Sequence, residues 1–479
     1  MSSSNVSPAI PQAFIDFITP TIPSHLSITD LINACQTSLR FSIRINTLKI
    51  SHENFIAMMT PLNWEFTPIP WCNDGFWVNT PDGSTAPGKL PEHLTGLFYI
   101  QEASSMMPPS ALFHNINEHE EKILPKKVLD LAAAPGSKTT QIATLMNNSG
   151  VLVANELSSS RIKALHSNLQ RLGVSNTLIS HFDGSVHGDY LENTFDAILL
   201  DAPCSGEGTV RKDPDAFKNW SVEHIDEITQ IQKSLIRSAF MALKPGGELV
   251  YSTCALNGSE NQGVCEWLLE EFKDNAQVIS LSTLFPEADK ALTPEGYLHI
   301  WPQIYNSEGF FVAKFTKSQA TDDTSNPTFR SKFPFTLLSK KQRPVIMETL
   351  NALLTLDDDF EDKLYSRDNE VWYFPEHSDE LTQSMRFVRH GVKLLDIKPK
   401  QSVITHDALT IWGNVTVSIN REQCVDFLKG KDIAIDNIDN AKGEVVLGYQ
   451  GQSIGLGKWV GNKIKNKLPR NLVNDHVAT

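Results

Sequence analysis

The feature that most constrains the fold is a regular alternation of short apolar runs with amphipathic stretches, which begins near Lys127. The segment 158–173 opens on serines, places Ile162, Leu165 and Leu169 on one face and ends at Gly173, so it is expected to be a helix. Strands that alternate with helices form a parallel sheet with helices on both faces. The sequence therefore predicts a doubly wound α/β core whose strands are 128–133, 151–156, 177–182, 196–201, 248–253 and 310–315.

The chain is long enough for more than one such core. It has 479 residues, of which 41% are hydrophobic, and single cores stop growing at about 250–300 residues. Large aliphatic residues give way to Ser, Thr, Asp, Asn and Pro in 316–332, as in a linker. We expect an N-terminal region at 1–105, the α/β core domain at 106–316, a linker at 317–332, an intermediate domain at 333–395 and a small β-rich module at 396–479.

Charge and composition exclude several classes of protein. A net charge of −14 argues against coating nucleic acid by bulk attraction, although a local basic patch can still contact phosphates. No apolar run approaches the ~20 residues that span a bilayer, and the first residues lack the features of a signal peptide, so we expect a soluble, cytoplasmic protein with no membrane partner. The six cysteines form no close pairs, which argues against a disulfide framework or a metal site.

A loop typical of cofactor binding follows the first strand of the core. The strand runs directly into APGSKTTQIA, where Pro135 and Gly136 make a tight turn into a helix with free backbone N–H groups. The loop lacks both the spaced glycines of a dinucleotide fingerprint and the full phosphate-loop pattern. A nucleotide-like cofactor without a diphosphate fits this loop best.

Acidic residues end the next three strands. Glu156 can accept hydrogen bonds from ribose hydroxyls, Asp183 can accept from an adenine amino group, and Asp201 faces the same edge of the sheet. The alternative for each is a local helix cap. Together with the APGSKT loop, the three carboxylates favour a cofactor site.

Two cysteines follow neighbouring strands of the predicted sheet. Cys204 lies in DAPCSGEGTVRKDPD after the fourth strand, and Cys254 ends KPGGELVYSTC after the fifth. Adjacent strands would bring the two thiols to within several ångströms of each other. The alternative is that both are small buried side chains. Their polar, Gly- and Pro-rich loops favour chemistry, whereas a packing role is expected for Cys35, Cys72, Cys265 and Cys424.

These motifs resemble the RNA 5-methylcytosine methyltransferases of the NOL1/NOP2/Sun family. The resemblance covers roughly residues 40–320, and Ala132 stands where many relatives carry cysteine. It implies a Rossmann-like S-adenosylmethionine methyltransferase core with an α/β N-terminal RNA-binding extension. The motifs that match in order are QEASSMMPPSAL, LDLAAAPGSKTTQIA, ANELSSSR, DAPCSGEGTVRKDP, KPGGELVYSTC and HIWPQIYNSEGFF.

The resemblance also implies roles for individual residues. Cys254 would be the nucleophile and Cys204 would help to release the product, with Lys138 and Asp201 close to the reacting base. A thiolate that adds to carbon 6 makes carbon 5 of cytosine nucleophilic, and a second group must then remove the proton from carbon 5. The residues implied to bind S-adenosylmethionine are Ala132, Ala133, Ala134, Pro135, Gly136, Ser137, Lys138, Glu156, Asp183 and Asp201.

Basic residues stand out in two other segments. The segment 40–50 reads as a strand that carries Arg40, Arg44 and, off register, Lys49. The C-terminal tail resembles the PUA-like module of bacterial 16S ribosomal RNA methyltransferases of this family. Its candidate RNA-binding residues are Lys458, Trp459, Lys463, Lys465, Lys467 and Arg470. The alternatives are a solvated basic tail and, for Trp459, a place in the core.

The sequence thus predicts a monomeric enzyme that methylates carbon 5 of a cytosine in 16S rRNA, within the small ribosomal subunit, with S-adenosylmethionine as cofactor. One alternative is a transfer RNA methyltransferase with the same chemistry. A second is a non-catalytic ribosome-assembly factor, which would be expected to have lost the thiols or the cofactor loop. A DNA methyltransferase would not be expected to need Cys254.

Overall fold

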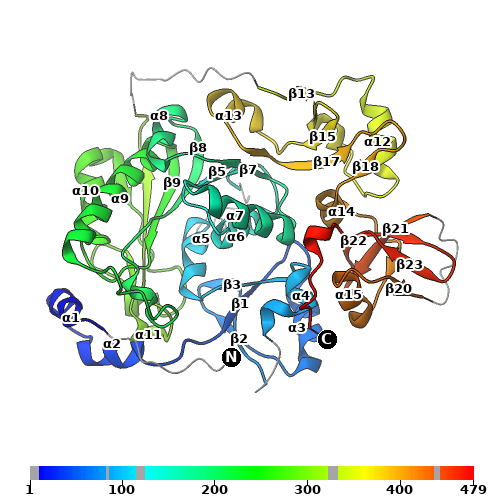
Figure 1. Cartoon of the computed structure of the whole chain (residues 1–479). Helices are drawn as coiled ribbons and strands as arrows, with labels where there is room; N and C mark the ends of the chain where they lie inside the picture. The colour runs from blue at the N-terminus through cyan, green and yellow to red at the C-terminus, as the bar shows by residue number, and fades with distance from the viewer. Residues whose placement is uncertain (1–9, 82–85, 115–123, 322–332, 436–442, 479) are drawn as a thin grey trace.

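A computed structural model describes residues 10–81, 86–114, 124–321, 333–435 and 443–478 (Figure 1). Most of the expected linker, 322–332, lies outside the described residues. The N-terminal part contains a four-stranded antiparallel sheet in the order β2-β3-β1-β4. Its elements are α1 (Gln12–Ile18), α2 (Ile28–Cys35), β1 (Ser42–Ile45), α3 (His52–Met59), β2 (Glu65–Ile69), β3 (Cys72–Asn79), α4 (Pro91–Leu94) and β4 (Phe98–Ile100).

The central sheet is the predicted α/β core. Its order is β10-β12-β9-β8-β5-β6-β7-β16, with β11 beside β12. Strands β5 to β9 are parallel, and β12 and β10 run antiparallel at one side. The chain moves outward from β5 through β6 to β7, then returns to place β8 on the other side of β5. In such sheets, ligands bind at this reversal, because the loops that follow the two neighbouring strands run to opposite sides of the sheet and leave a crevice between them.

The strand predictions are confirmed. All six predicted runs are strands of this sheet, and the predicted helix is α7, which ends at the left-handed Gly173 (φ 76°). The bounds of the strands are β5 (Lys127–Asp130), β6 (Val151–Asn155), β7 (Thr177–Ser180), β8 (Phe195–Asp201), β9 (Leu243–Thr253), β10 (Ala276–Val278), β11 (Leu298–Ile300) and β12 (Phe310–Lys317).

Helices cover both faces because successive side chains of a strand point to opposite sides. Val128 packs with α5, α6 and α7, whereas its neighbour Leu129 packs with α9 and α10. Among the described residues, no helix is long and apolar enough to span a membrane. The helices of this part are α5 (Met107–Leu112), α6 (Ser137–Leu145), α7 (Ser159–Leu172), α8 (His187–Tyr190), α9 (Val222–Ala242), α10 (Gln262–Phe272) and α11 (Pro302–Tyr305).

The expectation of a strand over 40–50 is wrong in its length. β1 covers only four residues, and after it the chain turns, with the Lys49 N–H donating to the carbonyl of Asn46. Arg44 and Lys49 are buried. Arg44 donates to Thr140 Oγ1 of α6 at 2.7 Å, and Arg40 donates to the carbonyl of Tyr305 at 2.6 Å. These cations hold the N-terminal part against the core rather than facing solvent.

Two further sheets complete the chain, in the orders β13-β14-β15-β17-β18 and β19-β21-β22-β23-β20. The boundary expected between 395 and 396 falls inside β17, and β18 extends the same sheet beyond it. The elements of this part of the chain are β13 (Thr336–Leu337), α12 (Arg343–Asn351), β14 (Leu364–Arg367), β15 (Glu370–Tyr373), α13 (Ser378–Ser384), β16 (Arg389–His390), β17 (Val392–Asp396), β18 (Val403–Ile404), α14 (His406–Trp412), β19 (Val417–Ser418), α15 (Arg421–Leu428), β20 (Ile433–Ala434), β21 (Glu444–Tyr449), β22 (Gln452–Trp459) and β23 (Lys463–Asn466).

The two ends of the chain pack together. Side chains of the N-terminal sheet and of the last sheet form one apolar cluster, and Figure 1 shows α3 and α4 beside α15 and β22. The carboxylate of Glu92, which is fully buried, pairs with Arg421 at 2.9 Å and accepts from the Tyr449 hydroxyl at 2.7 Å. The strand β16 also joins the edge of the core sheet by pairing with β7. The C-terminal modules are therefore built into the body of the protein.

The seam between the two ends should depend on Glu92. Glu92→Ala leaves the Arg421 guanidinium and the Tyr449 hydroxyl without their acceptor, and breaking a buried pair in this way costs about 3–5 kcal/mol. We expect a clear fall in the free energy of unfolding by urea denaturation. Glu422→Ala removes an exposed carboxylate from the same helix and serves as the control. Equal stability of the two variants would contradict a structural role for the seam.

Candidate active site

The structure brings the two predicted cysteines together. Strand β8 pairs with β9 so that Asp201 lies opposite Ser252, and the loops after these strands carry Cys204 and Cys254. The two Sγ atoms are 3.1 Å apart. Both cysteines are free thiols and partly accessible, whereas the other four are buried, as the packing interpretation expected.

Two buried carboxylates hold the cysteine loops in place. Glu207 follows Cys204 in the chain and Glu260 follows Cys254, and both are fully buried. Asn257 Nδ2 donates to both carboxylates at 2.7 Å, and the Ser205 hydroxyl, which has one proton to donate, also contacts both. Burial and the neighbouring Glu260 raise the pKa of Glu207. These side chains thus join the two loops into one hydrogen-bonded unit.

Sequence reasoning missed this carboxylate pair. Glu207 lies within the quoted motif DAPCSGEGTVRKDP and Glu260 follows the motif that ends at Cys254. A glutamate inside a Gly-rich loop beside a thiol is a usable signal, but the partner lies 53 residues away in sequence, by the difference of their numbers. Only the pairing of β8 with β9 brings the two together.

An ion pair lies across the reversal of the sheet. Lys138, in the first turn of α6 after β5, donates from Nζ to Asp201 Oδ2 at 2.6 Å. Asp201 Oδ1 also accepts from the Ser252 hydroxyl at 2.8 Å. Burial alone would lower the pKa of Lys138, but the carboxylate of Asp201, with a smaller contribution from Cys254, raises it. A permanent positive charge therefore lies near the thiols.

The electrostatics of the two thiols differ. The hydrogen bond with Cys254, then burial, and then the charges of Cys254, Glu260 and Glu207 raise the pKa of Cys204 well above its usual value. Cys204 consequently keeps its proton and is the natural donor in the contact between the two sulfurs.

The predicted cofactor residues line the same edge of the sheet. Gly136 takes a left-handed conformation (φ 104°) that favours glycine, and α6 begins directly after it. Glu156 follows β6, and its two carboxylate oxygens accept from the N–H groups of Ala134 and Ser158. Asp183 caps the turn after β7 by accepting from the Ser185 N–H. Ala132, Ala133, Pro135 and Ser137 belong to the same loop.

Glu156 and Asp183 therefore do accept hydrogen bonds from nearby backbone N–H groups, as the helix-cap alternative expected. They can still accept further hydrogen bonds from the cofactor. Each carboxylate oxygen has two lone pairs, and Glu156 uses one on each oxygen for the backbone. Its Oε2 also lies 3.5 Å from Arg161 Nη1, which leaves Oε1 as the freer acceptor. Asp183 is exposed, and only its Oδ1 accepts a hydrogen bond within the described protein. Acceptors for ribose hydroxyls and an adenine amino group thus remain at the ends of successive strands. Within the described residues, no cluster of His, Cys, Asp and Glu has the make-up of a metal site.

The predicted basic residues of the tail lie on the last sheet, away from the thiols. Lys458 and Lys465 are exposed and directly opposite each other on β22 and β23. Lys467 and Arg470 are also exposed. Lys463 is already paired with Asp432 at 2.8 Å. Trp459 is partly buried against the apolar cluster that joins the N-terminal sheet to the last sheet, so both residues have structural partners.

The fold and the site define an S-adenosylmethionine-dependent methyltransferase of the Rossmann-like type. Four family models cover the described modules in order. They are the N-terminal domain of 16S rRNA methyltransferase RsmF (10–103), 16S rRNA methyltransferase RsmB/F (115–316), the ribosomal RNA small subunit methyltransferase F pre-PUA domain (335–411) and the methyltransferase RsmF PUA domain (414–474).

Curated relatives match over nearly the whole chain. Ribosomal RNA small subunit methyltransferase F of Shewanella oneidensis is 51% identical, over 97% of each chain. The protein of the same name from Shewanella piezotolerans is 50% identical, over 98% of each chain. The chain belongs to the RsmB/F family of 16S rRNA methyltransferases, as a small subunit methyltransferase F, and it methylates carbon 5 of a cytosine in 16S rRNA.

Solved structures resemble the catalytic part. A methyltransferase homologue from Pyrococcus horikoshii is 32% identical, covers 64% of this chain and all of its own, and has a TM-score of 0.52. NSun6 from Pyrococcus horikoshii, solved with SFG, is 21% identical over 64% of this chain and 98% of its own, with a TM-score of 0.54. The predicted fold class, 16S rRNA substrate and S-adenosylmethionine cofactor are confirmed. The transfer RNA, assembly-factor and DNA alternatives are set aside.

Glu260→Ala should disturb the thiols without touching them. It leaves donors of Ser205, Gln232 and Asn257 without an acceptor, each costing about 1–3 kcal/mol. We expect a lower melting temperature and at least a tenfold fall in kcat for 16S rRNA methylation. Glu266→Ala, an exposed change on α10, is the control. Unchanged kcat in Glu260→Ala would show that the buried carboxylates do not order the loops.

Proposed function

We propose that Cys254 is the nucleophile that adds to carbon 6 of the target cytosine and that Cys204 removes the proton from carbon 5 to release the product. The observation that carries this proposal is the 3.1 Å contact of the two sulfurs beside the Lys138–Asp201 ion pair. Because Cys204 retains its proton, the sulfur available to attack is that of Cys254. The positive charge of Lys138 lies near that sulfur.

The Lys138–Asp201 ion pair also positions the base in this proposal. Asp201 is part-exposed, and its carboxylate has lone pairs left to accept from the exocyclic amino group of cytosine. Lys138 and Ser252 hold that carboxylate in a fixed orientation. A preoriented acceptor and a nearby cation stabilise charge as it moves into the ring during attack.

The proposed sequence of steps balances protons and electron pairs. The Cys254 sulfur forms a bond to carbon 6, and the electron pair of the ring double bond moves toward carbon 5, which takes the methyl group. Once Cys254 is uncharged, its contribution to the raised pKa of Cys204 is gone, and Cys204 then releases its proton to solvent. Cys204 then removes the proton from carbon 5, the ring double bond reforms, and Cys254 leaves as a thiolate.

S-adenosylmethionine supplies the electrophilic methyl group when it is bound. The proposed contacts place Glu156 at the ribose, Asp183 at the adenine amino group and the backbone of 132–138 around the remaining part of the molecule. Gly136 is required there because a side chain would be strained at its positive φ and would press on Leu165.

The proposed setting is the small ribosomal subunit in the cytoplasm, with the protein acting as a monomer. One support for this setting is the 16S rRNA substrate. The other is that the chain is acidic as a whole, while its tail carries a local group of exposed cations, namely Lys458, Lys465, Lys467 and Arg470. Two lysines placed directly opposite on neighbouring strands repel each other, and a bound phosphate would relieve that repulsion. We propose these four residues as phosphate contacts. We also propose that the chain divides into domains that correspond to its four sheets.

The roles of the thiols are tested by trapping. With S-adenosylmethionine and small subunits or 16S rRNA, Cys204→Ala should accumulate a covalent protein–RNA adduct, because the proton on carbon 5 is not removed. Cys254→Ser should form neither adduct nor methylated RNA. Labelled S-adenosylmethionine and denaturing gels measure both. An adduct in Cys254→Ser would reverse the assignment, and wild-type protein provides the turnover control.

The tail cations are tested by salt dependence. Replacing Lys458 and Lys465 with methionine together should weaken RNA binding and make the plot of log affinity against log salt less steep, by about 0.7–0.9 per lost phosphate contact. Filter binding with 16S rRNA at several salt concentrations measures it. Lys431→Met, an exposed lysine elsewhere in the module, is the control. An unchanged slope would remove these lysines from the RNA contact.

A further inference from the structure

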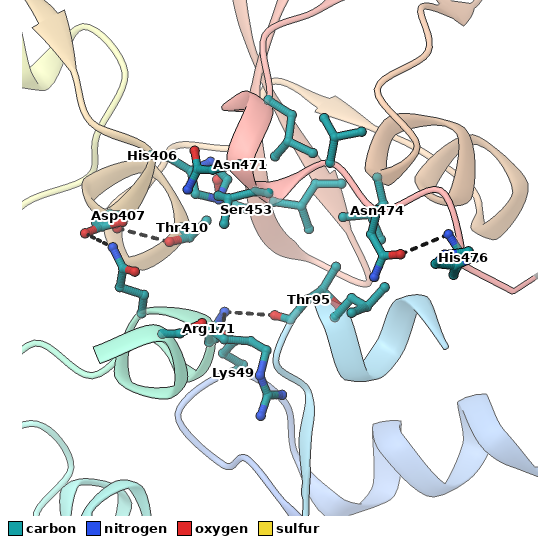
Figure 2. A pocket seen from close by; sticks show the side chains of 18 of the residues that line it. Lys49, Thr95, Arg171, His406, Asp407, Thr410, Ser453, Asn471, Asn474 and His476 are labelled. Atoms are coloured by element: carbon teal, nitrogen blue, oxygen red, sulfur yellow. Dashed lines mark hydrogen bonds between the residues drawn. The ribbon is translucent and has the colours of Figure 1, made fainter. Parts of the chain in front are cut away.

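Four parts of the chain that are distant in sequence enclose a cavity of about 530 Å³, away from the thiols (Figure 2). Lys49 and Thr95 come from the N-terminal part, and Arg171 comes from the end of α7 in the catalytic core. His406 to Thr410 come from α14. The remaining wall is formed by Ser453 and by 471–476 at the C-terminal end.

Lys49 places a buried charge at this cavity. Its side chain is buried, with the residue only 7% exposed. Nζ donates to the carbonyls of Thr95 at 2.9 Å and Arg171 at 3.0 Å, which uses two of its three N–H bonds. No carboxylate of the described residues forms an ion pair with it. Figure 2 shows Lys49 at the wall beside Arg171, with the open space above both.

The charge of the neighbouring Arg171 guanidinium makes it more unfavourable to bury the ammonium group of Lys49. The guanidinium of Arg171 donates to the carbonyls of His93 and Phe98 and to Asn168, and it too has no carboxylate partner among the described residues. Burial, and then Arg171, lower the pKa of Lys49 to about 7. A buried cation without a counterion is unfavourable, and an anion in the cavity would supply the missing partner.

The other ionisable groups of the wall leave this positive charge uncompensated. Asp407 accepts from Gln170 and is paired with Arg389 at 2.9 Å, so its charge is already neutralised. Burial lowers the pKa of His406 to about 4, which keeps its ring uncharged. Asp475 and His476 are exposed at the C-terminal rim.

The rest of the lining suits the organic part of a ligand. Leu94, Leu428, Ile454 and Leu468 give the cavity apolar walls, and side-chain amides of Gln170, Asn471 and Asn474 can pair with polar edges. A charged wall, apolar faces and amides together match a phosphate joined to a flat base. The volume is within the range of cavities that hold small ligands, about 300–1,000 Å³.

We propose that this cavity is a second nucleotide-binding site, in which Lys49 faces the phosphate and the apolar and amide walls receive the base. The nucleotide comes either from an RNA strand or from the free mononucleotide pool, since both carry the same recognised chemistry. The site is separate from the thiols and does not depend on their assigned roles. Because its walls come from all parts of the chain, occupancy would hold the N-terminal part, the core and the C-terminal modules together.

Binding measured on the whole protein tests this site. The probes are inorganic phosphate, the four nucleoside monophosphates, cytidine, and a short single-stranded oligoribonucleotide, each titrated by calorimetry. We expect at least one mononucleotide or the oligonucleotide to bind more tightly than phosphate or cytidine. Lys49→Met should weaken that binding at least tenfold. Lys398→Met, an exposed lysine outside the cavity, should leave it unchanged.

A second variant guards against a folding defect in Lys49→Met. Asn471→Asp adds a negative charge at an exposed residue of the rim and should weaken binding several-fold without loss of stability. Tighter binding of the oligonucleotide than of any mononucleotide would assign the site to RNA, and the reverse would assign it to a free nucleotide. Binding that is equal in wild type, Lys49→Met and Asn471→Asp, or no binding by any probe, would overturn the proposal. Mononucleotides that bind no better than phosphate would overturn the nucleotide assignment.

Discussion

The parallel pairing of β8 with β9 is the constraint on which the chemistry depends. It places Asp201 opposite Ser252, and the residues that follow the two strands then bring Cys204 and Cys254 to within 3.1 Å. Because β8 lies beside β5, the helix that begins after β5 can send Lys138 across to Asp201. One reversal of the chain thus brings the thiols, the cation and the carboxylate to a single edge of the sheet.

The surroundings of this edge keep it ordered. Glu207 and Glu260 accept donors from both cysteine loops, so a displacement of one loop breaks contacts of the other. The N-terminal helices α1 and α2 pack against Leu256 and Trp301 on the same side of the core. At the far side, Glu92 joins the N-terminal sheet to the last module. The modules around the core are therefore connected to it by buried polar contacts as well as by apolar packing.

Much of the fold could be predicted from local sequence. The six strands, the helix α7, and the loop between β5 and α6 follow from apolar periodicity and turn residues, which depend on neighbours along the chain. The two thiols were found because each follows a strand end. The backbone contacts of Glu156 and Asp183 agree with the helix-cap role that the sequence left open as an alternative. Their remaining lone pairs are consistent with cofactor binding as well.

What the sequence did not predict depends on pairing between distant segments. β16 joins β7 from a different part of the chain, and Arg44 and Lys49 are buried against the core. A basic residue in a strand gives no local sign that another domain will cover it. For the same reason the ion pair of Glu92 with Arg421, and the carboxylates beside the thiols, become visible only once the sheets are assembled.

The order in which the two thiols react tests whether Cys254 is the nucleophile. Native protein is treated with iodoacetamide across a pH series, and alkylation of Cys204 and Cys254 is followed by mass spectrometry. Because Cys204 keeps its proton beside Cys254, the account predicts that Cys254 is alkylated first and that Cys204 follows only at higher pH. Lys138→Met should slow the reaction of Cys254. Earlier alkylation of Cys204 than of Cys254 in the wild type would contradict the assignment of the nucleophile.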